Sequence, residues 1–151
     1  MNSASQRLLA IAQELALEDP TFFEKKGAGV GDRATAAFMH ELRRRAASSF
    51  GIDHAEQTIC GTNKLCVDYY YRDEATIVEV ALSLRNPTSE FERDILKAIM
   101  AQDNGHPVRR LVFISKPGAA RRLGAPSSRA IIEWAARAHD LMISVHEIVP
   151  G

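Results

Sequence analysis

Hydrophobic residues recur at helical spacing in four segments of the chain, and five shorter runs rich in β-branched and aromatic residues separate them. We expect helices over Ser5–Leu17, Arg33–Phe50 and Ser127–His139, and a further helix that begins after Thr88 or Ser89 and ends near Gln102. We expect strands over Gln57–Cys60, Leu65–Tyr71, Ala75–Leu84, Arg110–Ser115 and Leu141–Ile148.

The predicted order is α, α, β, β, β, α, β, α, β, which indicates an α/β fold with a mixed sheet and helices on both faces. At 151 residues the chain has the size of a single domain. Within it we distinguish an N-terminal helix and Gly-rich loop (1–32) from a core (33–148). Asp32 is a candidate N-cap for the second helix, and Trp134 is expected in the core.

Composition is that of an ordinary globular protein, with 46% hydrophobic and 25% charged residues. Its uncharged apolar stretches are too short to span a bilayer and no signal-peptide pattern is present, so we expect no membrane association and a cytoplasmic location. Only two cysteines occur, Cys60 and Cys66, and no zinc-ligand spacing accompanies them. Two partly buried thiols are the leading interpretation, with a disulfide or redox pair as the alternative.

The formal net charge is zero, but its distribution is uneven. Residues 66–103 contain eight acidic and four basic residues, whereas residues 109–137 contain seven basic residues and one acidic residue. An acidic segment followed by a basic one is compatible with a metal site beside a phosphate-binding surface, and equally with two segments that neutralise each other.

Asp68 and Glu79 each interrupt an apolar strand, where an unpaired charge costs several kcal/mol. Because side chains alternate along a strand, the turn at Arg72–Glu74 decides whether the two acids share a face. An even turn places Asp68 opposite Glu79, with Cβ atoms roughly 5 Å apart, and suits a shared divalent ion. An odd turn places the acids on opposite faces.

An acid on one strand, ten residues, and then hydrophobic-Glu-x-Lys on the next strand before a helix is the pattern of the PD-(D/E)xK nuclease superfamily. This chain resembles that family over residues 33–148, through Asp68, the segment Val78-Glu79-Val80-Ala81 and the core order αβββαβ. The resemblance implies a restriction-endonuclease-like fold in which Asp68 and Glu79 bind Mg²⁺ or Mn²⁺ and the ion activates water.

Where the family has its lysine, this chain has Ala81. Lys97, on the following helix, is the candidate replacement. Its spacing from Asp94 and Glu90 also fits a solvent-exposed charge stripe, in which Lys97 would take no part in chemistry.

Further candidates surround this motif. Glu41 on the second helix is a candidate additional metal ligand, with a salt bridge to Arg44 or Arg45 as the alternative. Candidate phosphate contacts are Lys116, Arg121 and Arg122 in the loop after the fourth strand, and Lys25 and Lys26 beside the Gly-rich loop.

The leading function is therefore a metal-dependent nuclease-fold protein that acts on DNA phosphodiesters, with weak activity left open, and the analogy suggests a homodimer. One alternative is a catalytically inactive nuclease-fold module that binds DNA or a protein partner. Another is an unrelated α/β interaction domain.

Overall fold

A computed structural model of the chain describes residues 2–24, 30–82 and 90–151. Contacts divide the chain into two compact units. The first comprises Met1–Asp53 with Ile148–Gly151, and the second comprises His54–Glu147. That the whole chain is a single domain stays a prediction.

The first unit contains helices α1 (Ala4–Leu17) and α2 (Val30–Phe50). A capping box starts α1: the Ser3 side chain accepts a hydrogen bond from the Gln6 backbone N–H, and the Gln6 side chain accepts one from the Ser3 N–H. The prediction that Asp32 caps the second helix was wrong, because α2 already begins at Val30. An aspartate is also favoured inside the first turn, near the positive end of the helix dipole, so its presence alone did not fix the start.

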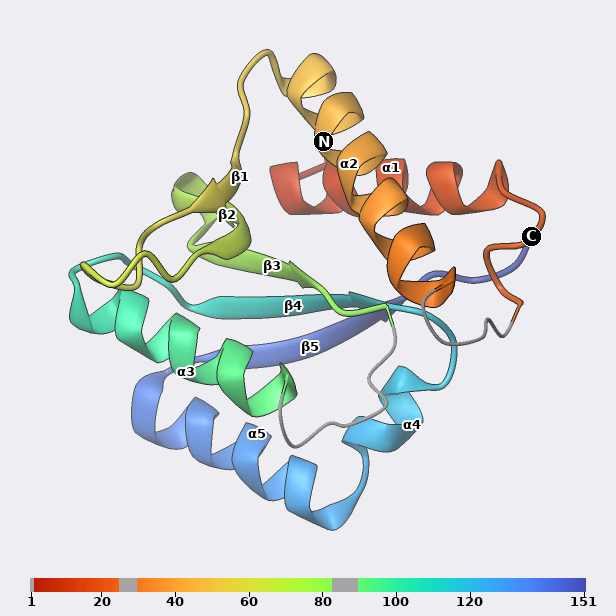
Figure 1. Ribbon diagram of the computed structural model, residues 1–151. Helices are drawn as coiled ribbons and strands as arrows, with labels where there is room; N and C mark the ends of the chain where they lie inside the picture. The colour runs from red at the N-terminus through yellow and green to blue at the C-terminus, as the bar shows by residue number, and fades with distance from the viewer. Residues whose placement is uncertain (1, 25–29, 83–89) are drawn as a thin grey trace. The chain divides into compact units, whose positions relative to one another are not determined.

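The second unit is a five-stranded mixed sheet whose strand order follows the chain order (Figure 1). The strands are β1 (Ala55–Gln57), β2 (Val67–Tyr71), β3 (Thr76–Val80), β4 (Arg110–Ser115) and β5 (Met142–Glu147). β1, β2 and β3 pair antiparallel, whereas β3, β4 and β5 pair parallel. The predicted mixed α/β class is confirmed.

Helices connect the parallel strands: α3 (Glu90–Asp103) follows β3, and α4 (Ala119–Leu123) and α5 (Pro126–His139) follow β4. The short α4 was not predicted. Figure 1 shows α3 and α5 on the same face of this sheet. That helices also cover the other face stays a prediction.

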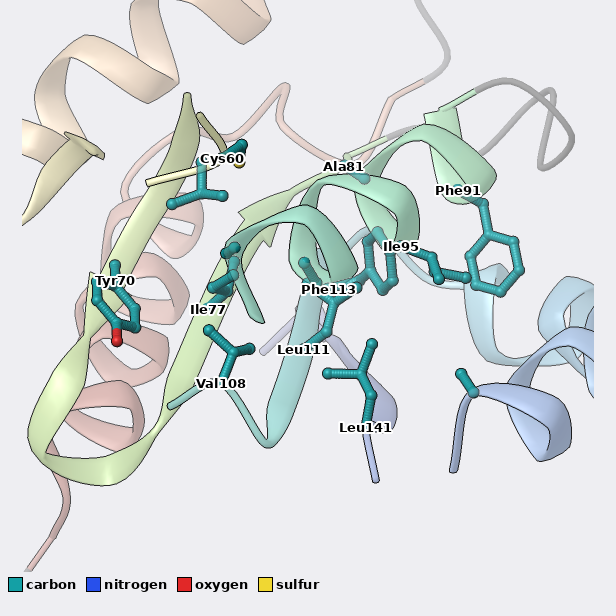
Figure 2. Close-up of a cluster of buried hydrophobic side chains, with 14 of the residues drawn as sticks. Cys60, Tyr70, Ile77, Ala81, Phe91, Ile95, Val108, Leu111, Phe113 and Leu141 are labelled. Atoms are coloured by element: carbon teal, nitrogen blue, oxygen red, sulfur yellow. The ribbon is translucent and has the colours of Figure 1, made fainter. Parts of the chain in front are cut away.

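The core of the second unit lies between this face and the helices (Figure 2). Alternation along β4 points Leu111 and Phe113 toward the helices, and the rings of Phe113 and Phe91 of α3 are 5.6 Å apart. Trp134 was wrongly predicted in the core: it is 40% exposed and packs edge-on against His139. Its neighbour Ala135 takes the inward position, and consecutive helical residues point in directions about 100° apart.

Four residues, Arg72 to Ala75, join β2 to β3, so the turn is even. Arg72–Glu74 form a single 3-10 turn, and Ala75 closes it with a left-handed backbone conformation (φ 52°). Tyr71 then pairs with Thr76 and Tyr69 with Val78. This register puts the residues before Tyr69 and after Val78 face to face.

Candidate active site

Asp68 and Glu79 are the next two opposing residues in this register. At this point hydrogen bonds between a backbone N–H and a carboxylate replace the backbone pairing of the two strands. The paired residues end at Tyr69 and Val78. The Asp68 N–H then donates to Glu79 Oε1 at 2.6 Å, and the Val80 N–H donates to Asp68 Oδ2 at 2.8 Å. The even turn therefore brings the two acids together, and each carboxylate has one oxygen anchored on the backbone of the other strand.

Lys97 of α3 reaches this carboxylate pair from the helix that covers the sheet. Its Nζ lies 2.6 Å from Glu79 Oε2, and the Lys97 side chain is only 12% exposed. The alternative of a wholly solvent-exposed charge stripe is therefore wrong for Lys97. It fails because α3 places Lys97 close to its inner face, one residue before the fully buried Ala98, and a long lysine side chain can carry its ammonium sideways to a buried acid.

Asp94 also belongs to the site, and its sequence position had not marked it as a site residue. Asp94 Oδ1 lies 3.2 Å from Lys97 Nζ, and the Asp94 side chain is 16% exposed. The signal was the spacing of three residues along one helix, which places Asp94 and Lys97 side by side. The same spacing fits a solvent-exposed pair, but it equally carries Asp94 inward together with Lys97.

Ala81 stands at the position where the PD-(D/E)xK pattern has lysine. It follows Glu79 by two residues, is 6% exposed and belongs to the hydrophobic core beneath α3, where Figure 2 labels it. The ammonium near Glu79 therefore comes from a helix instead of from the strand itself.

Burial and crowding of acids govern the electrostatics of the site. Burial, then the charges of Asp68 and Asp94, raise the pKa of Glu79 to about 9, and Lys97 only partly opposes this. Burial likewise raises the pKa of Asp68, against the Val80 N–H and Lys97. Burial alone would lower the pKa of Lys97, but Glu79 and Asp94 together raise it. Three carboxyl groups thus lie near one ammonium, and a proton or a further cation at this place would reduce the repulsion among the acids.

The two cysteines of the second unit are free thiols, as predicted. Cys60 is 1% exposed, and burial raises the pKa of its thiol while the charge of Lys97 opposes that shift. A raised thiol pKa disfavours the nucleophilic thiolate, so Cys60 is a packing residue in this position.

The donor atoms fit a hard divalent cation held with water. Asp68 and Glu79 each keep one oxygen that is not bonded to the neighbouring strand, and Mg²⁺ commonly binds to one or two carboxylates while retaining several waters. Within residues 2–24, 30–82 and 90–151, no three His, Cys, Asp or Glu side chains are placed to hold a metal ion together. A site built on these two acids therefore depends on water for its remaining ligands.

Glu41, the third metal-ligand candidate, belongs to the first unit. It pairs with Arg44 at 2.6 Å and with Arg45 at 3.0 Å, and these two guanidinium groups lower the pKa of Glu41 to about 2. Arg45 also pairs with Glu18 at 2.5 Å. The salt-bridge alternative is confirmed, and a metal role for Glu41 stays a prediction.

The basic residues that follow β4 lie at the carboxyl end of this strand, and Glu79 lies near the same end of the neighbouring strand β3. Glu79 pairs with Phe113, and β4 ends at Ser115. Lys116 follows directly, and its N–H donates to Leu82 O. Helix α4 is anchored by Glu147, whose carboxylate accepts from the Gly118 and Ala120 N–H groups.

Arg121 and Arg122 are both exposed on α4. The described part of the chain therefore presents two arginines on a helix that is fixed beside the carboxyl end of β4. Lys25 and Lys26 lie outside the described residues.

The candidate site is thus a buried cluster of acids with one lysine, built on a mixed sheet and the helix that covers it. Comparisons of the chain with protein-family models, curated proteins and solved structures found no match. No helix among the described residues is both long enough and apolar enough to cross a membrane.

Proposed function

We propose that this protein is a divalent-metal-dependent nuclease of the restriction-endonuclease-like fold that acts on DNA. The observation that carries the proposal is the meeting of Lys97 with Glu79, beside Asp68, in a buried site. Two strand acids and one lysine are the residues by which the PD-(D/E)xK pattern is defined, and here the lysine arrives from α3. The order β1–β2–β3–α3–β4 supports the same assignment.

Each residue has a role in this proposal. Asp68 and Glu79 hold Mg²⁺ or Mn²⁺, which when bound makes water a better nucleophile and offsets phosphate charge. Lys97 stabilises the negative charge that develops on the phosphate, and Asp94 orients Lys97. Lys116, Arg121 and Arg122 bind the DNA backbone, which they recognise by charge without reading sequence. Association as a homodimer stays a prediction.

The test is cleavage of plasmid and of short duplex DNA in the presence of Mg²⁺ or Mn²⁺. The wild-type protein is expected to nick or cut, and Asp68→Asn, Glu79→Gln and Lys97→Met are each expected to abolish cleavage. Glu92→Gln, an exposed acid on the same helix as Lys97, is the matched control and should keep full activity. Cleavage that survives Asp68→Asn would come from a contaminant or from another site.

A second candidate is an inactive nuclease-fold module that binds DNA. Ala81 in the lysine position favours it, together with the fact that no three metal-ligating side chains converge in the described part of the chain. DNA binding without cleavage, at any divalent ion tested, would support this candidate over the first.

A further inference from the structure

The ammonium of Lys97 stands where a cation bound to Glu79 would have to stand. It contacts Glu79 Oε2 at 2.6 Å and Asp94 Oδ1 at 3.2 Å, and little of the Lys97 side chain reaches solvent. Glu79 Oε1 is already held by the Asp68 N–H. The one Glu79 oxygen that remains for a metal ion is therefore the oxygen that Lys97 occupies.

A divalent ion and this ammonium compete for the same oxygen. Mg²⁺ binds carboxylate oxygens at about 2.0–2.1 Å, close to where Nζ now lies, and two cations on one buried oxygen repel each other. Lys97 has a second partner, since Asp94 lies one helical turn earlier on α3. If Lys97 leaves Glu79, it still has a counter-ion within reach and no helix has to move.

We propose that Lys97 is the internal counter-cation of this cluster of acids: its ammonium occupies Glu79 Oε2 in the metal-free protein and must release that oxygen before a divalent ion binds, while Asp94 retains Lys97. This inference rests on the proposed metal site at Asp68 and Glu79. Asp94 is then a positioning residue that acts through Lys97. A metal ion that binds Glu79 has to displace the Lys97 ammonium from Glu79 Oε2.

The test is the affinity for Mn²⁺, measured by the electron paramagnetic resonance signal of the free ion and without any DNA. Lys97→Met removes the competing charge at nearly constant volume and should bind Mn²⁺ about 10-fold more tightly, within the 5–150-fold range usual for coupled ligands. Lys97→Arg retains the charge and should show no gain.

Arg93→Met is the control for net charge, because Arg93 is an exposed cation one turn earlier on α3. It should leave Mn²⁺ affinity within about twofold, as exposed charges are screened. Tightening in Arg93→Met equal to that in Lys97→Met would overturn the proposal, and so would unchanged or absent Mn²⁺ binding in folded Lys97→Met.

The role of Asp94 is separated by a double-mutant cycle. Asp94→Asn should weaken Mn²⁺ binding in the wild-type background, because Lys97 loses its second partner, and should have much less effect when Lys97 is already methionine. An equal loss in both backgrounds would make Asp94 a direct metal ligand and contradict its positioning role.

A spectroscopic measurement covers the case in which Lys97→Met fails to fold. The lysine ammonium resonance assigned to Lys97 in the wild-type protein should shift when Mg²⁺ is added, because Nζ leaves Glu79, and an unmoved resonance at saturation would overturn the proposal. The outcomes are independent of cleavage. If the wild-type protein cuts DNA but Lys97→Met does not bind Mn²⁺ more tightly, the proposed function stands and this inference fails. If Lys97→Met binds Mn²⁺ more tightly but the wild-type protein does not cut DNA, the inference stands and the nuclease function fails.

Discussion

Lys97 Nζ contacts Glu79 Oε2 at 2.6 Å, and only 12% of the Lys97 side chain and 2% of the Glu79 side chain are exposed. A buried ion pair of this kind is weak evidence for stability, because desolvation opposes its attraction. It does make the two residues interdependent: without Glu79 the Lys97 ammonium is buried with fewer partners, and without Lys97 the Glu79 carboxyl stays beside Asp68 and Asp94 with no nearby cation. The free energy of unfolding should therefore change when either residue is replaced, and this can be measured without an assay of activity.

Replacing Lys97 by methionine tests this interdependence. Removing one partner of a buried pair costs roughly 3–5 kcal/mol when the other stays charged. With a pKa of about 9, Glu79 already holds a proton near neutral pH, so we expect a smaller loss of about 1–3 kcal/mol in the free energy of unfolding there. The loss should grow as pH rises and Glu79 is forced to ionise.

Urea unfolding of Lys97→Met and wild type at several pH values measures the difference. Arg93→Met, exposed on the same helix, should stay within about 0.5 kcal/mol of wild type. A penalty for Lys97→Met that does not change with pH would mean that lost packing, and not the ion pair, accounts for it.

Glu79 gives the metal-free protein a characteristic pH dependence. Its folded-state pKa is about 9, above its ordinary value of 4.5, so between these values the folded state binds more protons than the unfolded state. Stability contributed by the protonated carboxyl is present below about pH 4.5 and is lost as pH rises toward about 9. The free energy of unfolding should fall over this window in a buffer free of divalent ions.

Glu79→Gln should flatten this profile, because glutamine stays neutral throughout. Asp68, whose pKa burial also raises, leaves a residual slope of the same sign. Glu92→Gln should retain the full wild-type slope. If wild type and Glu79→Gln show parallel profiles, Glu79 does not titrate in this window.

The turn that brings Asp68 and Glu79 together contains a strained residue. Ala75 has φ 52°, a left-handed conformation that glycine adopts without the steric cost of a Cβ atom. Ala75→Gly should raise the free energy of unfolding by about 0.5–1 kcal/mol, after the larger entropy of glycine in the unfolded chain is subtracted. Ala120→Gly, at an exposed helical position in α4, should lower it instead. Thermal unfolding of the two variants distinguishes the cases, and a loss in both would show that Ala75 is not strained.

The sequence allowed the central strands and the longer helices to be predicted, because buried residues such as Leu111 and Phe113 flank a less buried one along β4. The first strand was predicted over Gln57–Cys60 and lies instead at Ala55–Gln57. The sequence also reduced the pairing of Asp68 with Glu79 to one unknown, the parity of the turn. That parity depends on the backbone of Arg72–Ala75, where no glycine or Asn-Gly pair marks the turn type.

The lysine was harder to predict, because helical spacing says which residues are neighbours and not which way a long flexible side chain reaches. Asp94 and Lys97 fit a solvent-exposed pair and an inward-facing pair equally well. The prediction that Trp134 is buried was wrong for a related reason. Its size argues for burial, but its position beside Ala135 on the helix decides its direction.

Arg121 and Arg122 should contribute to DNA affinity and not to stability. In an Asp68→Asn background, in which no cleavage is expected, changing each arginine to glutamine should weaken DNA binding. Each phosphate that the protein no longer neutralises should also reduce the slope of log affinity against log salt by about 1. Fluorescence anisotropy with a labelled duplex measures both quantities. Arg137→Gln, exposed in the last turn of α5, is the charge-matched control, and equal losses in all three variants would indicate binding by net charge alone.

Divalent ions should stabilise the folded protein through Asp68. A ligand that binds only the folded state, at 10 to 100 times its dissociation constant, adds about 1.4–2.7 kcal/mol to the free energy of unfolding. We expect a gain of this size with Mg²⁺ or Mn²⁺ and none with Asp68→Asn. The asparagine can still accept the hydrogen bond from the Val80 N–H, so the variant removes the charge while keeping that interaction. Thermal unfolding with and without the ion, beside Glu92→Gln as control, gives the comparison. An equal gain in Asp68→Asn would place the bound ion elsewhere on the molecule, whereas its selective loss would assign the ion to the two facing carboxylates of β2 and β3.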